Sequence, residues 1–175
     1  MWFFNKRRKT ERGGVTEAGV GRLPTLGKVL LVAGGSAASL AATTFAVRLC
    51  AAMGARLLAT YVVDTDSLSL LQTKGILLDD ETREFSDELS VKGRRYLERI
   101  MALSQAQRVS AETRLVHGRF VQTMVEMTQS SQADLLVMGS WSDVGTRDLA
   151  SRVRQTLLET VTCPVAVIKP PEAQG

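Results

Sequence analysis

Short apolar runs that alternate with longer amphipathic stretches constrain this chain more than any other feature of its sequence. The run ADLLVM, residues 133–138, is almost wholly apolar, as is typical of parallel strands whose two faces are both covered by helices. Four further runs have the composition of strands: residues 28–33, 55–63, 110–118 and 163–169. Between them lie stretches expected to be helical: residues 37–53, 85–103, 120–131 and 149–161. The alternation predicts an open α/β domain with a parallel sheet, helices on both faces and right-handed crossovers.

The connection after the second predicted strand is longer than the others. It begins with Asp64, Thr65, Asp66 and Ser67, which we interpret as turn formers. The amphipathic helix that follows is preceded by the acidic run at residues 79–81. Carboxylates at a helix start favour the helix dipole, so we expect a capping role for this run rather than a cation site.

The composition fits one domain of modest size. The chain has 175 residues, of which 45% are hydrophobic and 23% charged, which is ordinary for a globular protein. We place a flexible extension at residues 1–26, one domain at 27–170 and a short tail at 171–175. The stretch from residue 29 to 47 carries no charge, but a strand, a glycine turn and a buried alanine-rich helix explain it better than a membrane segment does.

The positive charge of the chain is concentrated in its first residues. Residues 1–28 hold seven Lys or Arg and two Glu, against a net charge of +4 for the whole chain, so the rest is nearly neutral. A nearly neutral body does not favour a dedicated nucleic-acid surface. The start combines an aromatic group with a basic one: Trp2, Phe3, Phe4, Lys6, Arg7, Arg8 and Lys9. This pairing suits docking on an anionic membrane surface or in a partner's groove, and a solvated terminus explains it equally well.

The reactive residue types do not assemble into a catalytic or metal-binding motif. Cys50 and Cys163 are far apart, and His117 is the single histidine, so neither a disulfide framework nor a metal site is indicated. No nucleophile, base and orienting acid can be put together from this order. We expect a surface or packing role for His117, and Met101, Met124 and Met127 to fill gaps in the core.

Three stretches resemble the universal stress protein family: VLLVAGGSAAS at residues 29–39, ADLLVMGS at 133–140 and LLETVTCPVAVIK at 157–169. The resemblance covers about residues 28–169. It implies a flavodoxin-like, adenine nucleotide alpha hydrolase-like fold with the strand order 3-2-1-4-5. It also implies a dimer, in which the last strands of two copies pair antiparallel.

The nucleotide motif of that family is only partly present. Family members that bind ATP carry an aspartate where this chain has Gly34, and a G-x-x-G loop in which Gly139 matches the first glycine and Ser142 replaces the second. Ser151 and Arg152 stand where a glycine and a serine would open the last helix, while Val63 agrees with the apolar end of the second strand. Loss of the carboxylate would weaken binding by on the order of 1–3 kcal/mol, and Arg152 adds a cation near the expected helix start.

The last predicted strand presents two faces to its surroundings. Val165 and Val167 share one face, and Ala166 and Ile168 share the other. The free edge of such a strand is suited to pairing with a second copy.

The leading hypothesis is a non-catalytic regulatory or accessory domain without a required cofactor. It is expected to be dimeric and cytoplasmic, with residues 1–9 docking it at the inner face of the membrane or on a membrane protein. The alternative is a stress-response switch that binds ATP, ADP or AMP, with slow ATP hydrolysis, in which Gly139, Ser142, Ser151 and Arg152 form an altered phosphate loop. A flavodoxin-like electron carrier is disfavoured, because GGSAAS lacks the Ser/Thr-rich phosphate loop that it would need.

Overall fold

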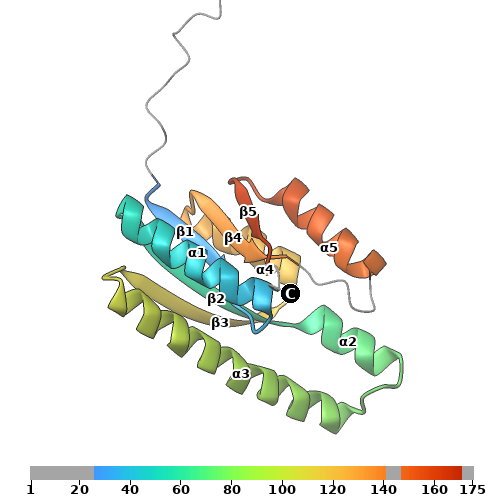
Figure 1. The fold of residues 1–175 in the computed structure, drawn as a ribbon. Coiled ribbons are helices and arrows are strands. Elements are labelled where there is room, and N and C mark those ends of the chain that lie inside the picture. The colour runs from blue at the N-terminus through green and yellow to red at the C-terminus, as the bar shows by residue number, and fades with distance from the viewer. Residues whose placement is uncertain (1–25, 141–146, 171–175) are drawn as a thin grey trace, which may run out of the picture.

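A computed structural model describes residues 26–140 and 147–170 and shows a three-layer α/β fold (Figure 1). Five parallel strands form the sheet, in the order β3-β2-β1-β4-β5. The strands are β1 (Lys28–Val32), β2 (Arg56–Asp64), β3 (Ala111–Gly118), β4 (Leu135–Gly139) and β5 (Val165–Ile168). The helices are α1 (Ala37–Met53), α2 (Thr65–Thr73), α3 (Asp79–Ala106), α4 (Phe120–Ser131) and α5 (Arg147–Thr160). The predicted fold class and strand order are confirmed.

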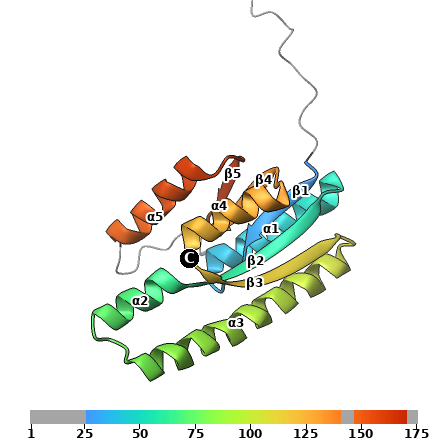
Figure 2. The same ribbon diagram turned by 180° about the vertical axis from the view of Figure 1, so that it is seen from behind.

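Helices cover both faces of the sheet and create two separate cores, as Figures 1 and 2 show from opposite sides. One core joins α1 and α3 to the sheet, with Ala46, Leu97 and Leu31 among its buried members. The other joins α4 and α5 to the opposite face, with Met124, Leu157 and Leu30 among its members. Neighbouring residues of β1 therefore serve different cores, which explains why both sides of these strands are apolar. Met124 and Met127 fill the second core as predicted.

The prediction of a turn after β2 is wrong, because the chain forms the helix α2 there. Asp64 is the N-cap of α2, and its carboxylate accepts hydrogen bonds from the Asp66 amide at 3.3 Å and the Ser67 hydroxyl at 2.6 Å. Asp, Thr and Ser favour turns and helix starts through the same side-chain hydrogen bonds, so the local residues are compatible with both. Leu68 is the one buried residue of this nine-residue helix, which explains why its apolar period is weak.

The acidic run at residues 79–81 caps α3, as predicted. Asp79, Asp80 and Glu81 all lie in its first turn. The Glu81 carboxylate accepts a hydrogen bond from the Leu78 amide at 2.8 Å, which satisfies a donor that the helix itself leaves free. Within the described residues, no cluster of three His, Cys, Asp or Glu is arranged to hold a metal ion.

The residues singled out for their reactivity occupy structural positions. Burial raises the pKa of the Cys50 thiol to about 11, so the thiolate is scarce at neutral pH. His117 lies on the edge strand β3, and its Nε2 is 3.1 Å from the Ser90 hydroxyl oxygen. The Ser90 hydroxyl donates its proton to the Ser86 carbonyl at 2.9 Å, so it is not activated as a nucleophile by His117. The pair joins α3 to β3.

The helix α1 differs in one respect from the buried helix that the alanines predict. Its inner face is buried against the sheet, but Leu40, Phe45 and Met53 are 51%, 41% and 55% exposed.

Across the two described ranges, no helix has both the length and the apolar character needed to cross a membrane.

Candidate functional site

A small cavity lies where the carboxyl ends of β1 and β4 meet. In the sheet, β2 and β3 lie on one side of β1, and β4 and β5 lie on the other. The direction in which the chain winds therefore changes between β1 and β4. Open α/β sheets bind ligands in the crevice at such a point. The cavity has a volume of about 280 Å³. It is lined by Val32, Gly34, Gly35, Ser36, Ser39, Phe120, Met138, Gly139 and Ser140.

The loop between β1 and α1 forms one wall of this cavity. The Ser36 hydroxyl caps α1 by accepting a hydrogen bond from the Ser39 amide at 3.1 Å. Gly34 lies against the same turn, because a Cβ built on it would lie 2.9 Å from the Ser39 hydroxyl oxygen. The wall therefore offers backbone, two hydroxyls and the positive end of the α1 dipole, and Gly34 contributes no carboxylate.

The tyrosines of α3 and β2 pack behind this loop. A Cβ at Gly35 would overlap the hydroxyl group of Tyr96, so a side chain at residue 35 would displace the Tyr96 ring from the loop. The Tyr96 ring lies 6.1 Å from the Tyr61 ring between centroids, and a Cβ at Gly93 would overlap Tyr61. Burial is the larger cause that raises the pKa of Tyr61, and the neighbouring Tyr96 raises it further. These contacts fix the position of the loop from the α3 side.

Gly139 has a packing role in the wall that β4 contributes. A Cβ at this position would lie 2.6 Å from the Ala38 carbonyl carbon and 2.6 Å from the Ser39 amide nitrogen. Real Cβ atoms do not approach backbone atoms so closely, so only glycine lets the first turn of α1 rest on β4 here. The contact with α1 is by itself enough to require glycine at this position.

Of the three predicted nucleotide residues whose side chains the structure describes, Gly34, Val63 and Gly139, it brings two together. Gly34 and Gly139 both line the cavity. Val63 is 1% exposed in the sheet and is not among the cavity residues. Ser142 lies outside the described residues.

The last helix starts earlier than the motif count implies. It begins at Arg147, so Ser151 and Arg152 follow its first turn and do not open it. Residues 147–150 contain no glycine or proline, and Asp148 lies in the first turn, where an acid favours the helix dipole. Arg152 therefore lies in the second turn, its side chain is outside the described part of the chain, and its role in binding a nucleotide stays a prediction.

A second and larger cavity adjoins the first, and Phe120 lines both. It has a volume of about 760 Å³ and lies between α2, α4 and α5. Its apolar residues are Leu70, Phe120, Val121, Val125 and Val153. Its polar residues are Asp64, Asp66, Ser67, Arg119, Gln122, Glu126, Thr156 and Thr160.

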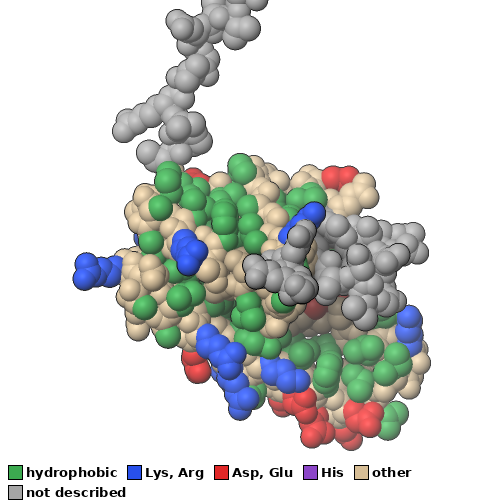
Figure 3. Space-filling view, viewed as in Figure 1, with side chains coloured by type: hydrophobic (Ala, Val, Ile, Leu, Met, Phe, Trp, Pro, Cys, Tyr) green, Lys and Arg blue, Asp and Glu red, His purple; other side chains and the backbone are tan. Residues whose placement is uncertain are grey.

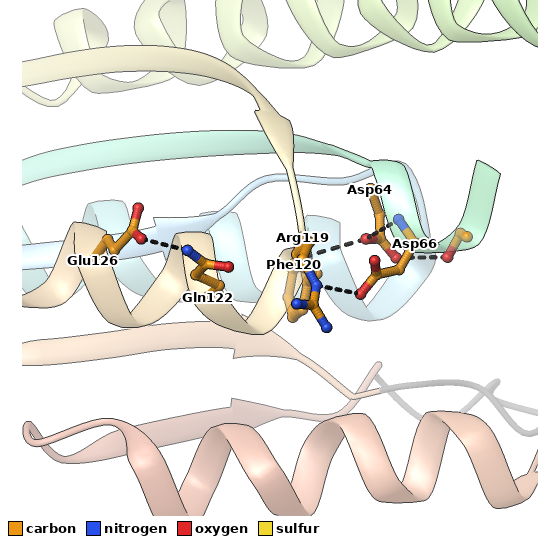
Figure 4. A network of polar contacts seen from close by, with 7 residues as sticks. Asp64, Asp66, Arg119, Phe120, Gln122 and Glu126 are labelled. Atoms are coloured by element: carbon orange, nitrogen blue, oxygen red, sulfur yellow. Dashed lines mark hydrogen bonds and ion pairs between the residues drawn. The ribbon is translucent and has the colours of Figure 1, made fainter. Parts of the chain in front are cut away.

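Hydrogen bonds at the ends of β2 and β3 organise this larger cavity (Figure 4). Asp64 accepts a hydrogen bond from the Phe120 amide at 3.2 Å, so one carboxylate holds the starts of both α2 and α4. Arg119 Nε lies 3.0 Å from the Asp66 carboxylate, and the Gln122 amide donates to Glu126 at 2.9 Å. The charged groups in the described part of the rim therefore have hydrogen-bond partners within the protein.

Sequence reasoning missed Asp64, Arg119 and Phe120 as neighbours of the candidate site. A signal was present, because each follows or ends a predicted strand, and the carboxyl ends of parallel strands meet at one edge of a sheet. Reading Asp64 only as a turn former concealed it.

Comparisons with known proteins agree with this architecture. A universal stress protein of Methanocaldococcus jannaschii is 27% identical over 148 residues, which are 84% of each chain. A solved universal stress protein family member from Burkholderia pseudomallei is 25% identical, with a TM-score of 0.64 over 84% of this chain and 98% of its own. A universal stress protein solved in complex with cAMP is 21% identical, with a TM-score of 0.59 over 83% of this chain and 98% of its own.

The family comparison covers most of the chain. The model described as Universal stress protein family matches residues 25–169, which include every helix and strand of the structure. The chain therefore belongs to the universal stress protein family.

Proposed function

We propose that this chain is a non-catalytic regulatory or accessory member of the family. One observation carries the proposal: none of the described residues that line the cavity between β1 and β4 has an ionisable side chain. General acid and base catalysis needs a titratable group within hydrogen-bond reach of the reacting atom, and no such group lines the cavity from the described residues. Its volume of about 280 Å³ also lies at the lower limit of small-molecule pockets, roughly 300–1,000 Å³.

Phosphate release from Mg-ATP tests this proposal. The purified full-length chain should release inorganic phosphate no faster than buffer. A rate that rises in proportion to protein concentration, and that survives further purification, would show that the chain is an enzyme.

An adenine-nucleotide switch is the second candidate, and the cavity walls that contain Gly34 and Gly139 favour it. These walls present backbone and serine hydroxyls beside the start of α1, where an anion is stabilised. A family relative has been solved with cAMP. If this function holds, Arg152→Ala weakens nucleotide binding through loss of a cation, whereas the regulatory function without nucleotide predicts no effect of Arg152→Ala on any nucleotide titration.

The free edge of β5 supports a homodimer in which two copies pair through this strand. Pro164 and Ile168 accept hydrogen bonds from the β4 side through their carbonyl groups, from Leu136 at 2.9 Å and Ser140 at 2.7 Å. Because backbone groups alternate along a strand, the amides of Val165 and Val167 point away from β4. These amides are available to a second strand.

Val167→Lys should disrupt this dimer. Val167 is 39% exposed on the edge strand, and two copies of the lysine would meet across a symmetric strand pair. We expect at least about a tenfold weaker dimer in light-scattering measurements over a dilution series. Val91→Lys is the matched control, since Val91 is 45% exposed on α3. Equal dissociation constants for both variants would contradict pairing through β5.

Residues 1–9 are proposed to dock the protein at the inner face of the membrane or on a membrane protein. The sequence supports this by joining three aromatic residues to four basic ones, because apolar insertion and electrostatic attraction strengthen each other at an anionic surface. Deletion of residues 1–9 should move the protein from the membrane fraction to the supernatant of lysed cells. An unchanged distribution after the deletion would count against docking by this segment.

A further inference from the structure

The outer face of α1 is apolar although it is exposed. We define the α1 face by the residues of the helix that line one broad groove of about 870 Å³ together with Lys169: Ala37, Leu40, Ala41, Thr44, Phe45, Arg48 and Leu49. Figure 3 shows hydrophobic side chains gathered on this side of the molecule, with basic side chains beside them.

A helix at the surface of a protein normally turns charged and polar residues outward. Arg48 is the single charged residue of α1, and the helix contains no acidic residue. Leu40 and Phe45 both line the groove and are 51% and 41% exposed. An exposed apolar groove of this kind marks an interaction site, and the charges beside it indicate which partner it can bind.

We propose that the α1 face binds the surface of an anionic lipid bilayer. Its apolar side chains would enter the boundary between headgroups and acyl chains, as those of interfacial amphipathic helices do. Arg48 and Lys169 would meet the lipid phosphates, since cations near an anionic leaflet are attracted to it. No acidic side chain on α1 opposes that attraction.

The position of residue 26 strengthens the assignment. The described chain starts at Leu26, and the carbonyl of Gly27 accepts a hydrogen bond from the Arg56 amide at 2.9 Å. Arg56 follows the α1 C-cap, Gly54, by two residues. The described chain therefore begins beside the carboxyl end of α1. Two weak membrane contacts give stable attachment where a single one does not, and residues 1–9 are the second contact proposed above.

A second copy of the chain is the competing occupant of the α1 face. Lys169 directly follows β5, so a dimer formed through that strand would lie near one end of the groove. A symmetric contact places the same patch on both copies, however, and would bring Arg48 and Lys169 toward the same cations of the partner. Anionic lipid balances these charges, so the bilayer is favoured.

The inference rests on the membrane docking proposed above, and the experiment separates the two. Binding is measured by sedimentation with vesicles of phosphatidylcholine alone or of phosphatidylcholine and phosphatidylglycerol in equal amounts. The variant L40S/F45S is compared with the control I76S/L158S, whose residues are 61% and 45% exposed outside α1. All variants are made both in the full chain and in the chain without residues 1–9, and each is checked by thermal melting.

L40S/F45S should bind the anionic vesicles about tenfold more weakly than wild type in both backgrounds, while I76S/L158S binds like wild type. Equal binding of the two double variants would overturn the inference. A change in mass of L40S/F45S without lipid, together with unchanged vesicle binding, would assign the face to a second copy and also overturn it. If the deletion alone has no effect but L40S/F45S does, docking by residues 1–9 fails and the α1 face stands.

Discussion

Gly139→Ala should lower the free energy of unfolding by about 2–3 kcal/mol. The new methyl group would lie 2.6 Å from two backbone atoms of α1, at Ala38 and Ser39. Backbone in the first turn of a helix cannot rotate away as a side chain can, so β4 and α1 must separate and expose part of their shared core. Urea unfolding followed by circular dichroism measures the loss.

Gly75→Ala is the control for this prediction. Gly75 has a φ of +67°, and a Cβ on it meets no heavy atom within 4 Å. The same substitution should therefore lower the free energy of unfolding by only about 1 kcal/mol, because alanine disfavours the left-handed backbone conformation. If Gly139→Ala is no more destabilising than Gly75→Ala, the close contact between β4 and α1 is wrong.

Leu157→Ala should lower the free energy of unfolding by about 2–5 kcal/mol. Leu157 is fully buried and joins α5 to the core that contains Leu30, Met124 and Leu136. Truncation removes contacts with several of these side chains and leaves a cavity, because the sheet cannot move to fill it. Thermal and urea unfolding of the same samples give the change.

The neighbouring residue provides the control. Leu158 is 45% exposed on α5, so Leu158→Ala should change stability by less than about 1 kcal/mol. A larger effect at Leu158 than at Leu157 would mean that α5 presents a different face to the sheet.

The sequence predicted the elements that are long or strongly patterned. β4 and α1 were identified because buried parallel strands and helices leave distinct apolar patterns. The strand order came from the family resemblance, since pattern alone does not say which strands are neighbours. α2 was not predicted as a helix, because its one buried residue, Leu68, produces no repeating apolar pattern. Its cap residues also resemble those of a turn.

The same sequence reasoning predicted only part of the candidate site. Gly34 and Gly139 were found because they align with the nucleotide motif of the family that the sequence resembles, and both line the cavity. The packing role of Gly139 could not be read from sequence, because it depends on how closely α1 approaches β4. Phe120 and Asp64 are 56 positions apart and meet only when the sheet is formed.

Isothermal titration of the purified full-length chain with Mg-ATP, ADP, AMP and cAMP tests the central claim most directly. The account predicts no heat of binding and no thermal stabilisation up to millimolar concentrations, because Gly34 supplies no carboxylate and the described wall of the cavity carries no charged side chain. Saturable binding of any of these nucleotides would contradict a purely accessory role and establish the chain as a nucleotide-responsive switch.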